Sequence, residues 1–318
     1  MVVRARTIFI MAAALLLVSC HKEICYDHHH AGQHLQVIFD WGELDPTTVH
    51  GMTLLLYPED GSAPLRFPFA DIQGGTISVT SGTYNALCVN DDELLHLQGE
   101  ESWETVSVTT GETGLVARAA FNNTKSDIPR AQGSEEERVL REPPLLYTAT
   151  RMNFYVKAAE DTQQILRLTP QMPLGQIYVR VEAVENARFL ETLSGVVTGL
   201  SSSLSLTTLE PSDDHCTMPV NLTLTEDGYL EGWLNYFGHC PTTELPHSLA
   251  IYTMLIDTSK QANIYDITEQ MHPGEGKEED KNHEVIIPVL PLPTPEPAEG
   301  GFDINLDEWN TTSIEIKM

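Results

Sequence analysis

Alternation of apolar and other residues with a period of two is the feature that most constrains how this chain can fold. In the stretch 35–41 (LQVIFDW), Leu35, Val37 and Phe39 occupy every second position, and the stretch 177–183 (IYVRVEA) repeats the pattern. Successive side chains of a strand point to opposite faces of a sheet. A period of two therefore predicts strands with one buried face.

Short runs rich in β-branched or aromatic residues predict further strands, and turn residues separate them. These runs span residues 52–57, 76–79, 83–89, 105–109, 152–157, 220–225, 230–237, 249–256 and 313–318. One short helix is expected over residues 185–193, where Phe189 and Leu193 lie four residues apart. Many short strands with few helical periods predict an all-β protein built from β-sandwiches.

Two prolines, Pro170 and Pro173, interrupt the strand patterns and predict a domain boundary there. We therefore expect an N-terminal β-sandwich domain over residues 33–170 and a C-terminal one over residues 171–318. A proline-rich segment, 288–297, precedes the final run and predicts an extended crossing. We expect the last strand to belong to the second sandwich, with Ile314, Ile316 and Met318 facing its core.

The N-terminus has the pattern of an export signal. Arg4 and Arg6 precede an apolar run, residues 7–18, that is too short to span a bilayer, so residues 1–19 are interpreted as a signal peptide. The sequence LVSC ending at Cys20 resembles a bacterial lipobox. This resemblance implies cleavage before Cys20 and a diacylglycerol on its thiol, with residues 20–32 as a tether. The alternative is an ordinary signal peptide followed by an incidental cysteine.

The residues after Cys20 bear on where the protein is placed. The sequence His21-Lys22-Glu23 resembles the charged signal that directs Bacteroidetes lipoproteins to the outer leaflet, although only one acidic residue follows Lys22 directly. We therefore expect a lipid-anchored protein of the outer membrane, exposed at the cell surface. The run 28–30 (HHH) is interpreted as part of the solvated tether, because three adjacent histidines offer only loose metal chelation.

The net charge and the lack of known catalytic motifs argue against several classes of protein. The chain has 46 acidic and 18 basic residues and a formal net charge of −28, so nucleic acid is not an expected partner. The sequence contains no His-Glu-x-x-His, no Gly-x-Ser-x-Gly, no phosphate-binding loop and no Cys-x-x-Cys. We therefore expect a non-enzymatic protein with no catalytic residue, no metal site and no cofactor.

With Cys20 acylated, four cysteines remain in an oxidising compartment. The dipeptides His215-Cys216 and His239-Cys240 flank a predicted hairpin, and these four side chains offer a zinc ligand set. Adjacent strand residues point to opposite faces, however, so a Cys216–Cys240 disulfide is the favoured prediction. A second disulfide is expected between Cys25 and Cys88, which would attach the tether to the first sandwich.

Several stretches resemble a family of Bacteroidetes lipoproteins of unassigned function, itself similar to the fimbrillin and minor-fimbrium anchor group. They are CHKEICYDHHH, VIFDW, GMTLLLYPEDG, GGTISVTSGTYNALCVND, the serine-rich stretch 197–206, TMPVNLTL, FGHCP, GGFDINLDEW and IEIKM. The resemblance implies two tandem transthyretin-like (Greek-key) β-sandwiches on a lipid anchor, taking part in fimbrial assembly or adhesion. It implies neither a ligand nor a catalytic residue.

Three functions remain open at this point. The favoured one is an anchor or accessory subunit of a fimbria-like assembly, whose sheet edges pair with a strand of another subunit. A polymerising fimbrillin is one alternative, in which an arginine-specific protease cuts the polar segment that contains Arg130, Arg138 and Arg141. The other alternative is a carbohydrate-binding surface lipoprotein, in which Trp103 or Trp309 stacks on a sugar.

Overall fold

A computed structural model describes residues 33–117, 120–121, 127–158, 164–241, 246–272, 281–295 and 308–316. This part of the chain is nearly all β: its strands form five sheets, with one 3-10 turn and one short helix, α2 (Thr268–Met271). No helix within it has both the length and the hydrophobicity needed to cross a bilayer. The expected signal peptide and tether, with Cys20 and Cys25, lie outside the described residues.

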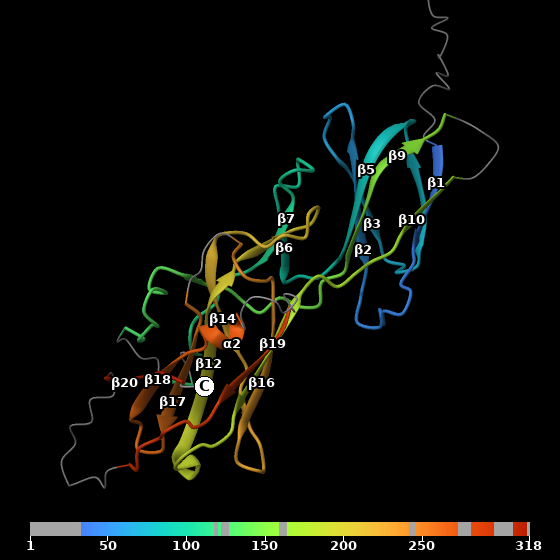
Figure 1. Cartoon of the computed structure of the whole chain (residues 1–318). Helices are drawn as coiled ribbons and strands as arrows, with labels where there is room; N and C mark the ends of the chain where they lie inside the picture. Colours follow the sequence, from blue (N-terminus) through green and yellow to red (C-terminus); the bar gives the residue numbers. More distant parts are fainter. Residues whose placement is uncertain are drawn as a thin grey trace, which may run out of the picture.

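The first β-sandwich packs a three-stranded sheet against a four-stranded one (Figure 1). The three-stranded sheet has the order β10 (Gln164–Leu168), β1 (Gln33–Phe39) and β4 (Gly74–Val79). The four-stranded sheet has the order β3 (Leu65–Phe69), β2 (Met52–Pro58), β5 (Gly82–Asn90) and β9 (Thr148–Val156). Leu35, Val37 and Phe39 of β1 are buried in the core between them, which confirms the alternation predicted there.

The second β-sandwich has a six-stranded and a four-stranded sheet (Figure 1). The larger has the order β20 (Trp309–Ile314), β18 (Lys260–Asp266), β17 (Ser248–Leu255), β12 (Leu190–Ser201), β14 (His215–Val220) and β8 (Arg138–Val139). The smaller has the order β15 (Thr223–Leu224), β16 (Leu230–Tyr236), β11 (Gly175–Val181) and β19 (Asn282–Ile287). Ile177, Val179 and Val181 of β11 are buried in the core, as predicted.

A small fifth sheet connects the two sandwiches. Its order is β13 (Ser203–Ser205), β7 (Ser107–Thr110) and β6 (Leu95–Gln98). Strand β7 pairs with β13, and β8 pairs with β14, so strands from before residue 170 share sheets with strands from after it. The chain thus leaves the first sandwich after β5, adds strands to the rest of the molecule, and returns as β9. The division at residues 170 and 171 stays a prediction.

The helix predicted over residues 185–193 is wrong. Only Ala187–Phe189 form a 3-10 turn, and strand β12 begins at Leu190. Strand β12 pairs on one side with β14 and on the other with β17, so its backbone hydrogen bonds are made across the sheet. The pairing of a long central strand outweighs a single apolar i, i+4 pair, because one such pair contributes only about 0.2–0.5 kcal/mol to a helix.

The last strand, β20, belongs to the second sandwich, as predicted, but it spans Trp309–Ile314 rather than the predicted run 313–318. It runs parallel to β18, with Lys260 opposite Trp309 and Tyr265 opposite Ile314. Ile314 and Ile316 pack against the main core of the second sandwich, whereas Met318 lies outside the described residues. The strand is further held by Trp309, whose ring centroid lies 5.8 Å from that of Phe121 and 5.5 Å from that of Tyr252.

We expect Trp309→Ala to lower the free energy of unfolding by about 3 kcal/mol, because it removes an aromatic ring packed against two others at the edge of the six-stranded sheet. The matched control is Trp233→Ala, since Trp233 is 59% exposed on β16 and its removal should cost less than about 1 kcal/mol. Denaturant titration of both variants measures the difference. Equal, small losses would show that β20 is not anchored through its tryptophan.

Candidate functional site

A short hairpin, β15 with β16, forms between Cys216 and Cys240, but neither cysteine lies on its paired strands. Strand β14 pairs with β12 and β8 in the six-stranded sheet, whereas β16 pairs with β11 and β15 in the four-stranded sheet. The predicted run 220–225 is therefore divided, because Val220 ends β14 and only Thr223–Leu224 pair with β16. Cys216 and Cys240 consequently do not lie opposite each other on paired strands.

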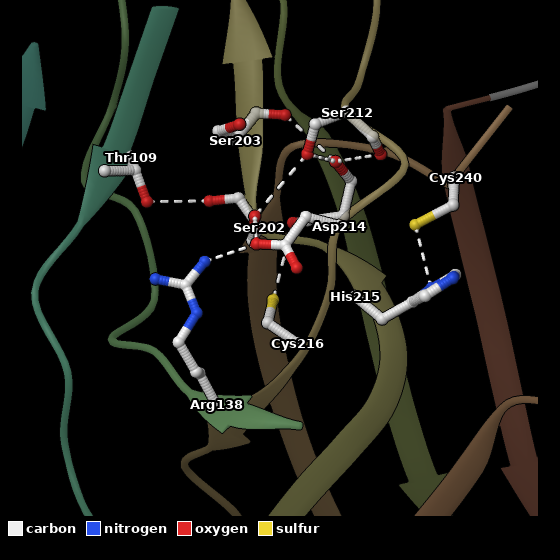
Figure 2. A network of polar contacts seen from close by, with 10 residues as sticks. Thr109, Arg138, Ser202, Ser203, Ser212, Asp214, His215, Cys216 and Cys240 are labelled. Carbon is white, nitrogen blue, oxygen red and sulfur yellow. Dashed lines mark hydrogen bonds and ion pairs between the residues drawn. The ribbon is translucent and has the colours of Figure 1, made fainter. Parts of the chain in front are cut away.

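The Cys216–Cys240 disulfide expected from the sequence is not formed, since both residues are free thiols. Sγ of Cys216 is buried and lies 3.5 Å from the carbonyl oxygen of Ser201, whereas Sγ of Cys240 lies 3.0 Å from Nδ1 of His215 (Figure 2). His215 and Cys216 are neighbours on one strand, so their side chains point to opposite faces. Cys240, which contacts His215, therefore lies on the face of β14 opposite to the side chain of Cys216.

Cys88 is a buried free thiol on β5. Its side chain belongs to the core of the first sandwich, and its carbonyl oxygen accepts a hydrogen bond from the Thr148 hydroxyl at 2.8 Å. Cys25, its expected partner, lies outside the described residues. The structure therefore shows Cys88 as a core residue and leaves the expected pairing untested.

The pairing of His215 with Cys240 raises the question of nucleophilic chemistry. Burial raises the pKa of the Cys240 thiol to about 12, and the carboxylates of Asp213 and Glu137 add to the shift. A catalytic cysteine needs a lowered pKa, because the thiolate is the nucleophile. The pKa of the Cys240 thiol is raised rather than lowered, so the contact with His215 is not interpreted as a catalytic cysteine–histidine pair.

A polar network at the start of β14 joins strands from both halves of the chain (Figure 2). The Ser202 hydroxyl donates to Oδ2 of Asp214 at 2.9 Å, and Arg138 of β8 forms an ion pair with the same carboxylate. The Thr109 hydroxyl of β7 donates to the Ser202 carbonyl at 2.7 Å. Burial raises the pKa of Asp214, but the Ser202 hydrogen bond and Arg138 outweigh it, and the net pKa is lowered.

Sequence reasoning missed this network, although the three consecutive serines at 201–203 are a visible signal for it. The Ser201 hydroxyl donates to the carbonyl oxygens of Ser203 and Ser212, both at 2.9 Å. Buried hydroxyl groups need hydrogen-bond partners, so a run of serines inside a strand-rich stretch indicates a polar junction between strands. The network is therefore structural: it holds β7, β8, β12 and β14 in register.

The segment that contains Arg130 and Arg138 is held against the second sandwich. The Arg130 guanidinium donates to the carbonyl oxygen of Glu137 at 2.7 Å, and the Glu137 carboxylate accepts a hydrogen bond from the Thr217 hydroxyl at 2.7 Å. Arg138 belongs to β8, which pairs with β14. A protease needs an accessible backbone, so the structure gives no support for cleavage at these two arginines.

The two tryptophans considered as sugar platforms both pack inward. Trp309 belongs to a core cluster with Tyr252, and the ring centroid of Trp103 lies 5.7 Å from that of Tyr57, edge to face. The most exposed tryptophan is instead Trp233, which lies 4.6 Å from Tyr178 between ring centroids. Trp103 and Trp309 are thus partly buried residues that pack against the core clusters.

Comparison with solved structures identifies the class of fold. The chain is similar to a crystal structure described as "a putative adhesin from Bacteroides ovatus ATCC 8483", with a TM-score of 0.62, 16% identity, and coverage of 87% of this chain and 99% of that chain. It is also similar to "the fimbrial anchor protein Mfa2 from Porphyromonas gingivalis", with a TM-score of 0.43, 14% identity, and coverage of 69% and 76%. The first similarity shows that the β-sandwich architecture is shared.

The sequence places the chain in a family. Residues 19–221 match the family described as "Domain of unknown function (DUF5119)", which covers more than half of the chain, and the chain belongs to this family. A relative from Bacteroides ovatus, described as "Putative fimbrium anchoring subunit Fim4B", is 23% identical over 196 residues, which are 60% of this chain and 53% of the relative. The match thus spans about half the length of that relative. It confirms the resemblance to fimbrial anchor proteins seen in the sequence.

We expect Cys216 and Cys240 to be recovered as free thiols when the protein is purified from its native cells and alkylated in denaturant without a reductant. In the folded protein the same residues should react slowly, because burial raises the pKa of each thiol and keeps it from the reagent. Peptide mapping by mass spectrometry measures both states. Recovery of a peptide in which Cys216 is linked to Cys240 would contradict the structure.

Proposed function

We propose that this chain is a non-enzymatic cell-surface lipoprotein that acts as an anchor or accessory subunit of a fimbria-like assembly. The observation that carries the proposal is the similarity to the relative described as "Putative fimbrium anchoring subunit Fim4B". The β-sandwich fold shared with an adhesin supports it. In this proposal the domains 33–170 and 171–318 are tandem transthyretin-like sandwiches carried on a lipidated tether.

The anchoring step is assigned to Cys20, within the lipobox-like sequence LVSC. Buried acyl chains contribute about 0.8 kcal/mol per methylene, so diacylglycerol together with a further acyl chain holds a protein at a membrane without a spanning helix. The short charged signal after Cys20 supports placement in the outer leaflet of the outer membrane. The acidic surface, with a net charge of −28 over the chain, suits an exported protein that must stay soluble.

The assembly step is assigned to the edges of the six-stranded sheet. Strand β8 pairs with only Cys216 and Thr217 of the six-residue strand β14. On the opposite edge, most side chains of β20 are exposed. An incompletely paired strand edge offers backbone N–H and C=O groups to an incoming strand, which is the way in which β-strand addition joins subunits. A neighbouring subunit would pair at one of these edges.

The test compares wild-type protein with Cys20→Ala, expressed in the native cell with a C-terminal epitope, and uses Cys25→Ala as the matched control. We expect wild type and the control to remain in the outer-membrane fraction, with an acylated Cys20 as the first residue, and to recover a fimbrial subunit after cross-linking. Cys20→Ala should be released from the membrane, because the lipid is its attachment.

Two results would count against the proposal. If the N-terminus is an unmodified residue other than Cys20, and the Cys20→Ala protein is still bound to the membrane, Cys20 is not the membrane anchor. A lipidated protein that recovers no fimbrial subunit and gives a strong glycan-array signal would instead support a carbohydrate-binding lipoprotein. In that case Trp233 is the aromatic residue to replace first, since it is the most exposed tryptophan.

A further inference from the structure

Four histidines that are far apart in sequence meet at one end of the second sandwich. His239 follows β16, His247 precedes β17, His272 follows α2, and His283 lies on β19. Helix α2 lies at this end of the sandwich (Figure 1). Nε2 of His239 lies 3.0 Å from Nε2 of His283, and Nε2 of His247 lies 2.9 Å from Nε2 of His272. These four residues are called the histidine cluster below.

The orientation of His247 leaves a lone pair directed into the cluster. Its Nδ1 lies 3.1 Å from the Thr198 carbonyl oxygen, which accepts hydrogen bonds and cannot donate them. Nδ1 of the neutral ring must therefore carry the proton, and Nε2 the lone pair. Nε2 is the atom that faces His272. A histidine whose Nδ1–H is held by a backbone carbonyl while Nε2 points inward has the arrangement typical of a metal ligand.

The position of His247 is fixed by its surroundings. The residue is 2% exposed, and its backbone N–H donates to the Thr268 hydroxyl of α2 at 2.9 Å. The Thr198 hydroxyl of β12 accepts a hydrogen bond from the backbone N–H of Ser248 at 3.1 Å. These contacts hold the His247 ring between β12 and α2. The side chain would therefore lose little conformational entropy if its Nε2 bound an ion.

His239 occupies the centre of the cluster. Its ring centroid lies 5.1 Å from that of His247, 4.7 Å from that of His272 and 4.9 Å from that of His283. Its Nδ1 is buried and has no hydrogen-bond partner. An unsatisfied buried nitrogen costs about 1–3 kcal/mol. A cluster of imidazoles that contains such an atom is therefore poorly explained as a set of hydrogen-bonded core residues alone.

The spacing of the ligand atoms fits a small cation. One ring nitrogen each from His239, His247 and His272 lies within 4.8 Å of the other two. Nitrogens that bind zinc tetrahedrally at 2.0–2.1 Å lie about 3.3 Å from one another, which is close to the 2.9 Å between Nε2 of His247 and Nε2 of His272. His283 lies outside this group of three and is placed beside it by His239, whose Nε2 lies 3.0 Å from that of His283. Its ring would have to shift toward the other three to share the ion. Imidazole ligands suit zinc, copper and nickel, whereas calcium and magnesium prefer oxygen.

Burial disfavours the protonated form of His239 and His247. Burial lowers the pKa of His239 to about 3, and the neighbouring histidines add to the shift. Burial also lowers the pKa of His247 to about 4. Both rings are therefore neutral at neutral pH, which is the form that binds a metal ion.

We propose that His239, His247 and His272 bind one divalent transition-metal ion of the zinc type, with His283 as the fourth ligand. Four protein ligands make a closed site, which is typical of structural zinc rather than catalytic zinc. The ion would link the end of β16, the start of β17, α2 and β19, and so join both sheets of the second sandwich. His272 is exposed and gives the ion a route into the site.

The sequence predicts no metal site and groups His239 with His215. The structure separates those two, because His215 contacts Cys240 while His239 contacts the other cluster histidines. The four cluster residues are single histidines on separate elements, and their wide spacing matches no metal-binding motif. Only the tertiary fold brings them together.

The test is a zinc titration of the full mature chain, purified without a histidine tag and stripped of metal. His28, His29 and His30 are replaced by alanine in every sample, because adjacent tether histidines chelate loosely. We expect one zinc per chain and a rise in melting temperature on zinc addition, since an ion that binds only the folded state stabilises it. Titration with Co²⁺ should give the visible absorption of a tetrahedral nitrogen site.

The variants make the proposal falsifiable. His272 is exposed, so His272→Ala should fold, which far-ultraviolet circular dichroism checks, but bind zinc at least tenfold more weakly and lose the metal-dependent rise in melting temperature. His283→Ala should show the same loss, and His96→Ala, an exposed histidine of β6, should match the parent. A parent chain without stoichiometric zinc, or a His272→Ala chain with unchanged affinity, would overturn the site. Unchanged zinc affinity in the His283→Ala variant would show that His283 is not a ligand of the ion.

Discussion

Burial of one sheet on both of its faces is the constraint on which the rest of this structure depends. Leu54 and Leu56 of β2 point into the core of the first sandwich, whereas Leu55, between them, points to the opposite face and is equally buried. A strand that is buried on both faces is a continuous apolar run, which accounts for the sequence MTLLLY. The chain must therefore cover the second face, and the segment between β5 and β9 does so. Its Trp103 packs edge to face on Tyr57.

The same covering segment joins the two sandwiches. Val106 and Val108 lie in one core cluster with Leu55 and Leu87 of the first sandwich and with Leu204 and Leu206 beyond β12. Strand β7 pairs with β13, and the Asp214 carboxylate connects Arg138 with Ser202. Apolar packing and polar contacts thus cross between the sandwiches at one place. In the proposed anchoring role, a pull between the lipid and an attached subunit would pass through this junction.

The sequence predicted the elements that depend on local pattern. The alternation at β1 and β11, the apolar run of β2 and the return of β20 to the second sandwich were all readable, because each depends on the side-chain period or on the proline-rich crossing before it. The errors arose where distant pairing decides the structure. Residues 190–193 form a strand because β17 pairs with them. Strand β14 pairs with β12 in the larger sheet and not with β16. Because β14 and β16 belong to different sheets, Cys216 and Cys240 do not lie opposite each other, and the predicted disulfide between them is not formed.

Calorimetric unfolding of the mature chain tests most directly the claim that the two sandwiches form one cooperative unit. If they share a core and the connecting sheet, a single transition should be observed, with a calorimetric enthalpy equal to the van't Hoff enthalpy. Two resolved transitions, each with its own enthalpy, would show that the sandwiches unfold independently and would contradict the account.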